Sequence, residues 1–166
     1  VIVKIDGDGQ MDPSLLSRFI APILKGEADY TKGNRFYDLV QIGNMPPMRL
    51  FGNAVLSFMT KLSSGYWSVF DPTNGYTAIH AKTAAYLPMD KIDNRYFFET
   101  DMLINLNIEN CVVKDVSIPA MYADEQSSMS IKKIIFSFPP KLFNGFVKRI
   151  FLKYYIFDFN MLSIYL

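Results

Sequence analysis

The stretch that decides the fold is VIVKIDGDGQMDP, residues 1–13. Its first five residues are Val or Ile except for Lys4, which predicts a buried strand. Asp6 and Asp8 follow, one residue apart, on a glycine-rich turn. Side chains two residues apart on an extended chain share a face, so the two carboxylates are directed at one spot and repel each other. A bound divalent cation would offset this repulsion.

The ligand chemistry open to such a cation is narrow. Cys111 and His80 are the only residues of their types, so a cysteine cluster and a histidine-rich site are excluded. Oxygen ligands remain, and they favour Mg²⁺, Mn²⁺ or Ca²⁺. An EF-hand loop is also excluded, because Ser17 stands at the position of its closing acid and a strand precedes the loop. An Asp-Gly turn with two solvated acids is the remaining structural alternative.

The rest of the chain alternates between helical and strand patterns. Asp12 is placed to cap a helix with Pro13 at its first position, Gly26 to end it, and Pro22 to kink or shorten it. Beyond it we expect a strand in residues 28–36, a helix over 48–62, two strands in 66–81, a helix over 95–106 and a strand in 111–119. With 166 residues, half of them hydrophobic, this predicts one layered α/β domain.

The carboxyl-terminal part is basic and aromatic. Residues 126–157 hold six bases and no acid, whereas residues 1–125 hold 15 acids and 11 bases. Pro139 and Pro140 should stop any helix before them. Beyond them, apolar side chains at helical spacing alternate with bases, which predicts a basic amphipathic helix on an anionic membrane surface. A helix packed on the domain is the alternative. Nucleic acid is a poor partner for bases confined to the tail of an acidic domain.

Several short motifs, taken in order, resemble one enzyme family. They are DGDGQMDP, ADYTKGNRF, PPMRLFGNAVLSF, DPTNGYTAI, FFETDML and a final IP followed by Tyr. The ordered set is similar to the polyprenyl-phosphate sugar synthases, of the dolichyl-phosphate mannose synthase type. These are inverting family 2 glycosyltransferases with the three-layer α/β GT-A fold and a DxD motif.

The resemblance begins in the middle of the family's domain. It implies that residues 1–135 are the C-terminal part of a catalytic domain and that residues 136–166 are a juxtamembrane amphipathic segment. The family's amino-terminal nucleotide-binding half has no counterpart here. We therefore expect this chain on its own to be an inactive excerpt of a longer enzyme.

The resemblance also implies roles for particular residues. Asp6 and Asp8, with Gln10, would hold Mg²⁺ or Mn²⁺ against the donor diphosphate. Arg35 and Arg49 match basic positions that contact phosphates, and a guanidinium fork suits phosphate oxygens. Without the family, the residues favour an ordinary role for each arginine, with Arg35 solvating a loop and Arg49 pairing on the surface of its helix.

Two further acids are candidate bases or acceptor positioners. Asp71 lies in an Asp-Pro turn and Asp101 near a helix start, and both places also have ordinary structural explanations. The family usually has an arginine and a Ser-Lys-rich loop after the IP strand. Tyr122 stands in place of that arginine, and Lys132 with Lys133 offers the charge instead.

The expected function is metal-dependent, inverting transfer of a sugar from a nucleotide sugar to a polyprenyl phosphate, on the cytoplasmic face of a membrane. Transfer to a saccharide hydroxyl is the main alternative. A haloacid-dehalogenase-like phosphatase is a weaker one, because Gln10 stands where that family has Thr or Val. A non-catalytic binding module of the same fold is the third.

Overall fold

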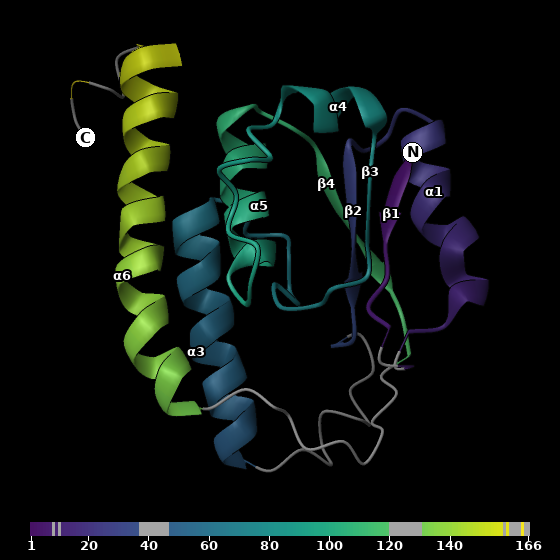
Figure 1. Cartoon of the computed structure of the whole chain (residues 1–166), viewed down its shortest axis with the longest axis horizontal. Coiled ribbons are helices and arrows are strands. Elements are labelled where there is room, and N and C mark those ends of the chain that lie inside the picture. The colour runs from purple at the N-terminus through teal and green to yellow at the C-terminus, as the bar shows by residue number, and fades with distance from the viewer. Residues whose placement is uncertain are drawn as a thin grey trace.

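The computed structural model describes residues 1–7, 9, 11–36, 47–119, 131–157, 159 and 164, without the side chains of residues 47–50, 53 and 131–136. This part of the chain forms a mixed sheet between helices (Figure 1). The strands are β1 (Ile2–Lys4), β2 (Tyr30–Asn34), β3 (Thr77–Ile79) and β4 (Val113–Ser117), in the spatial order β1-β3-β2-β4. Strand β3 is antiparallel to β1 and β2, and β2 is parallel to β4. The expected layered α/β architecture is confirmed at this level.

The first strand is not buried, although its sequence predicts that it should be. Val1 is 44% exposed and Ile2 is 54% exposed. Within the described residues β1 pairs with β3 alone and lies at the edge of the sheet, so its outer side has no neighbouring strand. The buried centre of the sheet is β2, all five residues of which are buried.

One face of the sheet is covered by α1 (Leu16–Leu24), which follows a short 3₁₀ turn, η1 (Pro13–Leu15). The expected cap is confirmed, because the Asp12 side chain accepts a hydrogen bond of 2.8 Å from the Ser14 N–H. Gly26 ends the helix in the left-handed region, with φ of +70°. Phe19 is fully buried and stacks on Tyr76 of the loop before β3, with ring centroids 3.9 Å apart.

The opposite face is covered by α5 (Phe98–Ile108), whose Leu103 and Leu106 are fully buried against the sheet. The short α4 (Ala81–Tyr86) follows β3. The expectation of two strands within residues 66–81 is wrong, because β3 is the one strand in this fully described range. The preceding residues form a loop around Asp71 and Asn74, and side-chain hydrogen bonds described below replace the pairing of a strand.

Two long helices, α3 (Pro47–Ser64) and α6 (Ile131–Ile150), lie side by side beyond α5 (Figure 1). A π-helical segment, η2 (Phe151–Phe157), continues α6. The expected stop at Pro139 and Pro140 is wrong, because α6 runs through both prolines. Phe138 and Leu142 are buried on either side of them, and the Phe138 ring meets the Phe97 ring edge to face at 5.4 Å. This packing outweighs the two missing backbone hydrogen bonds.

Candidate functional site

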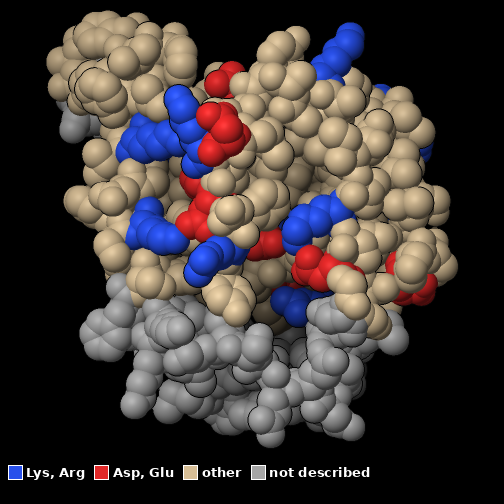
Figure 2. All heavy atoms as spheres, viewed as in Figure 1, with Lys and Arg blue, Asp and Glu red and all other residues tan. Residues whose placement is uncertain are grey.

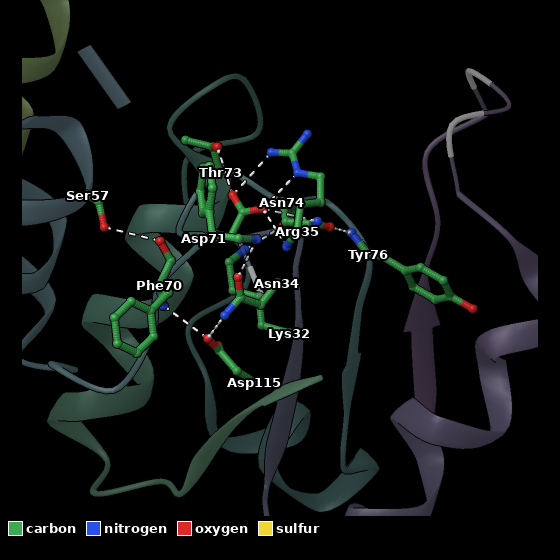
Figure 3. A network of polar contacts seen from close by, with 11 residues as sticks. Lys32, Asn34, Arg35, Ser57, Phe70, Asp71, Thr73, Asn74, Tyr76 and Asp115 are labelled. Atoms are coloured by element: carbon green, nitrogen blue, oxygen red, sulfur yellow. Dashed lines mark hydrogen bonds and ion pairs between the residues drawn. The ribbon is translucent and has the colours of Figure 1, made fainter. Parts of the chain in front are cut away.

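A polar network lies where β2 ends, and Asp71 is its centre (Figure 3). The Asp71 side chain is fully buried. Arg35, the residue after β2, donates from Nε to Oδ2 of Asp71 at 2.7 Å and from one terminal nitrogen, Nη2, to Oδ1 at 3.1 Å. The Arg35 backbone N–H donates to the same Oδ2 at 3.3 Å. Arg35 and Asp71 therefore form a two-pronged ion pair, which is the strongest geometry for these groups.

The turn that carries Asp71 closes around this carboxylate. The Thr73 hydroxyl donates to Oδ1 at 3.3 Å, and the Asn74 amide donates to Oδ2 at 3.4 Å. Burial by itself would raise the pKa of Asp71, but the hydrogen bonds and charge of Arg35, with the charge of Lys32, lower it below its ordinary value. Asp71 is thus an ionised and fully hydrogen-bonded carboxylate.

Lys32 lies beneath this turn, in the middle of β2, and is fully buried. Its Nζ donates to the backbone carbonyl of Asn74. Burial lowers the pKa of Lys32 to about 8, against the opposing attraction of Glu99 and Asp71. A lysine within a strand otherwise reads as a surface residue, so no local pattern pointed to Lys32 as part of the network.

Asp115 of β4 is a second carboxylate that sequence reasoning missed. Its Oδ2 accepts hydrogen bonds from the Asn34 amide at 2.8 Å and from the Phe70 backbone N–H at 3.0 Å. Its Oδ1 is buried without a hydrogen-bond partner among the described residues. Burial raises the pKa of Asp115. An acid inside the apolar strand pattern VVKDV was the available signal.

Asp6 meets the Asp71 turn at Gly75. A Cβ added at Gly75 would lie 2.0 Å from Oδ2 of Asp6, so the carboxylate rests against bare backbone. Lys4 Nζ donates to Oδ1 of Asp6 at 2.7 Å, to Glu99 at 3.1 Å and to the Gly75 carbonyl at 3.4 Å. The sequence singled out Asp6 and Asp71 separately, and the structure places Asp6 against Gly75, at the end of the turn that Asp71 begins. Glu99 is a further acid there that the sequence analysis missed, although it precedes Asp101 by two residues.

The predicted metal ligands are only partly within the described residues. Asp8 and Gln10 lie outside them, and in the described part no three His, Cys, Asp or Glu side chains gather as a metal site. Asp6 has the hard oxygen donors that Mg²⁺ and Mn²⁺ prefer, and its side chain is 43% exposed at the end of β1. In this structure the ammonium of Lys4 supplies the positive charge beside it. Asp6 therefore fits the predicted set, and the set as a whole stays a prediction.

Asp101 lies in the first turn of α5 and has local partners. Its Oδ2 accepts a hydrogen bond of 2.9 Å from the Asp93 N–H, and its Oδ1 accepts one of 3.1 Å from the Asn105 amide. These contacts fix the loop before α5 to the helix. Among the described contacts none joins Asp101 to Asp71, so the two candidate bases do not share one hydrogen-bond network.

The remaining predicted residues can be placed only by element. Arg49 lies in the first turn of α3 and Lys132 in the first turn of α6, and their side chains are not among those described. Tyr122 and the loop around it lie outside the described residues.

The bases of the tail helix turn towards the domain. Arg149 is 7% exposed and donates from Nε to the Ser63 carbonyl at 2.8 Å. Lys148 donates to the Asn105 side chain at 2.8 Å, and Lys153 donates to the Asn107 carbonyl at 3.0 Å. Lys141 pairs with Asp93, and its side chain is 46% exposed. These bases of α6 and η2 therefore contact the domain, beside the buried Phe138 and Leu142.

Aromatic and aliphatic side chains lie on the outer side of the same helices. On α6 and η2, four residues spaced by four are between 38% and 67% exposed: Phe143, Val147, Phe151 and Tyr155. On α3, Phe51, Val55, Phe58 and Leu62 are also largely exposed, at 39–67%. We call these eight residues the outer apolar stripes. On the face shown in Figure 2, Lys and Arg side chains instead lie next to Asp and Glu side chains.

Fold and site together define an α/β domain in which the Arg35 guanidinium follows the carboxyl end of β2 and the Asp6 carboxylate follows the carboxyl end of β1. This class of arrangement suits phosphate-bearing ligands. No protein-family model matches the chain. It is 29% identical over 128 residues to an uncharacterized protein of Methanocaldococcus jannaschii. The matched region covers 77% of this chain and 52% of that protein.

A second relative has a named activity. The chain is 29% identical over 124 residues to a UDP-N-acetylglucosamine–dolichyl-phosphate N-acetylglucosaminyltransferase of Methanococcus voltae. The matched region covers 75% of this chain and 49% of that protein. The chain thus spans about half the length of the curated relatives it matches. This likeness supports a relationship to glycosyltransferases.

Proposed function

We propose that this chain belongs to the catalytic domain of an inverting glycosyltransferase that moves a sugar from a nucleotide-sugar donor to a polyprenyl phosphate. The observation that carries the proposal is the Arg35 fork, held by Asp71 at the end of β2, with Asp6 adjoining the same turn. A guanidinium in this place can stabilise charge that builds on a departing diphosphate. The similarity to a dolichyl-phosphate sugar transferase supports the same activity.

The remaining roles follow from the predicted positions. Asp6, Asp8 and Gln10 would hold Mg²⁺ or Mn²⁺, which when bound supplies positive charge to the diphosphate leaving group. Arg49 would contact a donor phosphate, and Lys132 would contact the phosphate of the acceptor. These assignments extend the proposal, and each can be tested by substituting the single residue concerned.

The state of the two candidate bases favours a phosphate acceptor over a sugar hydroxyl. A sugar hydroxyl needs a base that removes its proton, whereas a lipid phosphate, with a second pKa of about 6, is largely ionised at pH 7. Asp71 has donors on both oxygens and a lowered pKa. Asp101 also has donors on both oxygens. The Asp71 carboxylate is therefore not arranged to accept a proton, which supports the polyprenyl phosphate as acceptor.

A lipid acceptor requires the enzyme to work at a membrane, and the outer apolar stripes suit that place. Phe and Tyr side chains on an exposed helix face are typical of segments that lie in a bilayer interface. No described helix combines the length and the apolar character needed to cross a membrane. We propose that α3 and α6 rest on the cytoplasmic surface of the membrane.

The test is a transfer assay with the full-length protein in vesicles. UDP-N-acetylglucosamine and dolichyl phosphate, with Mn²⁺ or Mg²⁺, form the first pair, followed by other nucleotide sugars. We expect a glycosyl-phosphoryl lipid whose anomeric configuration, read by NMR, is inverted relative to the donor. Transfer to saccharides alone would replace the proposed acceptor with the hydroxyl alternative. Absence of transfer from any nucleotide sugar to either acceptor would overturn the proposal.

A further inference from the structure

We propose that Asp71 is a positioning residue that holds the Arg35 guanidinium in one orientation for a phosphate-bearing substrate and takes no proton during the reaction. The inference rests on the proposed function for the identity of the substrate. It concerns a relationship between two residues that the sequence treats as independent, one as a phosphate contact and one as a base or acceptor positioner.

The first support is the number of donors around the carboxylate. A carboxylate has about four lone-pair sites. Asp71 accepts five hydrogen bonds, three from Arg35 and one each from Thr73 and Asn74, at distances between 2.7 and 3.4 Å. No acceptor site remains for a substrate hydroxyl. The full burial of the side chain also keeps it from meeting a substrate directly.

The second support is the side of the guanidinium that Asp71 uses. The carboxylate binds Nε and Nη2, which form one edge of the planar group. Figure 3 shows the far edge of the Arg35 guanidinium directed away from Asp71. The Arg35 side chain is 36% exposed, while its partner is fully buried. One edge is thus anchored on a buried carboxylate, while the side chain as a whole stays partly exposed.

The third support is that the backbone at Arg35 is held on both sides. The Asn34 side-chain oxygen accepts a hydrogen bond of 2.9 Å from the Phe36 N–H, and the Asn34 amide donates to Asp115. The Arg35 N–H itself donates to Asp71. The Arg35 backbone is therefore held in place where β2 ends, and the Asp71 carboxylate holds the guanidinium at the end of the side chain. Such pre-organisation lowers the entropy lost when a phosphate binds.

A general base would need different surroundings. It should retain affinity for a proton and lie within hydrogen-bond reach of the group that it deprotonates. The Arg35 charge lowers the pKa of Asp71, and the donors occupy its oxygens. The geometry therefore assigns Asp71 the role of orienting Arg35.

The experiment is a double-mutant cycle of Asp71→Asn and Arg35→Gln in the full-length protein, with Glu27→Gln as control. Glu27 pairs with Lys114 on the surface at 2.8 Å, so this control also removes one partner of an ion pair. We expect D71N to raise the KM for the nucleotide sugar roughly ten- to a hundredfold, with a smaller change in kcat. In the R35Q background D71N should change kcat/KM less than about twofold, because the guanidinium that it orients is already gone.

Two outcomes would overturn the proposal. Additive losses in the double variant would show that Asp71 acts without Arg35. A D71N enzyme with unchanged KM, a collapsed kcat and no acidic limb in its pH–rate profile would identify Asp71 as the base.

A measurement that needs no turnover separates this inference from the proposed function. R35Q leaves a buried carboxylate without its counter-charge, so its midpoint of thermal unfolding should fall well below that of wild type. The double variant removes that charge and should recover much of the loss. If R35Q and the double variant melt alike, the ion pair does not hold as described, whatever reaction the enzyme catalyses. If the unfolding midpoints behave as expected and wild type transfers no sugar, the proposed function fails. The positioning of Arg35 by Asp71 is then still supported.

Discussion

Arg149 of α6 closes the carboxyl end of α3 through the backbone of Ser63. Its Nε donates to the Ser63 carbonyl at 2.8 Å, and one terminal nitrogen donates to the Leu62 carbonyl at 3.1 Å. The last carbonyls of a helix have no partner within the helix and carry partial negative charge. A base distant in sequence therefore satisfies the end of α3 and fastens the tail helix to the domain. Gly65 leaves room for it, since a Cβ there would lie 3.0 Å from a terminal nitrogen of Arg149.

The first prediction concerns this contact. We expect Arg149→Gln to lower the free energy of unfolding by about 1–3 kcal/mol, because two buried carbonyls lose a charged donor. Urea unfolding followed by Trp67 fluorescence measures the change. Lys25→Gln, which removes an exposed base near the end of α1, is the control and should change the same quantity by less than about 0.5 kcal/mol. Equal effects of the two substitutions would show that Arg149 does not cap α3.

The second prediction concerns membrane binding. The sequence predicted that the bases of the tail attract anionic lipid, which makes binding sensitive to salt. In the structure these bases contact α5 and the end of α3, and the outer apolar stripes face outward. We therefore expect the double substitution Phe143→Ser and Phe151→Ser to weaken vesicle binding at least tenfold, since each buried ring contributes about 1.5–3 kcal/mol.

The design of that experiment uses flotation of the full-length protein with neutral and anionic vesicles at low and high salt. Binding that survives high salt and neutral lipid supports hydrophobic contact. The matched control is Lys141→Gln with Lys148→Gln, which removes two bases from the other side of the helix and should have a small effect. If the lysine pair matters more than the phenylalanine pair, the electrostatic interpretation from the sequence is the better one.

The third prediction follows from Lys32. Its folded pKa of about 8 lies below the ordinary value of 10.5, so between these two pH values the unfolded chain binds more protons than the folded one. Its contribution to stability therefore rises with pH in this window, by at most about 1.4 kcal/mol per pH unit. Cys111 and Tyr30, whose pKa values are raised by burial, act in the opposite direction.

Comparison with Lys32→Met isolates the lysine from those groups. We expect the unfolding free energy of wild type minus that of K32M to become more positive from pH 8 to pH 10. The same difference should be nearly constant from pH 6 to pH 7.5. A difference that is flat across the whole range would mean that Lys32 titrates as an ordinary lysine.

The fourth prediction concerns Gly75. A methyl group there would lie 2.0 Å from Oδ2 of Asp6, so Gly75→Ala must displace the carboxylate. If Asp6 is a metal ligand, the affinity for Mn²⁺ in the presence of a nucleotide sugar should fall roughly tenfold or more, as judged by calorimetry on the full-length protein. Gly52→Ala on α3, where a Cβ would meet nothing within 4 Å, is the control. Unchanged Mn²⁺ affinity in G75A would remove Asp6 from the proposed ligands.

Sequence reasoning succeeded where the determinants are local. The Asp12 cap and the Gly26 terminator depend on residues within a few positions of one another, and the structure bears them out. It also placed Asp6 at the end of a strand. These features need no knowledge of the partner elements.

It failed where distant residues decide. Pro139 and Pro140 read as a helix stop because the buried contact of Phe138 with Phe97 is invisible in the local pattern. The residues before Asp71 read as a strand, because the contact that closes the turn, from Arg35 36 positions away, is not visible in the local pattern. Lys32 and Asp115 read as ordinary strand residues, although the sheet places both beside this turn.

The two prolines inside α6 have a consequence of their own. Neither has an N–H, so the backbone ladder is interrupted at two successive positions while the helix axis continues. The carbonyls of residues 135 and 136 therefore lack the intrahelical hydrogen bonds that residues 139 and 140 would otherwise donate. We therefore expect amide hydrogen exchange to be faster in residues 131–138 than in residues 143–150.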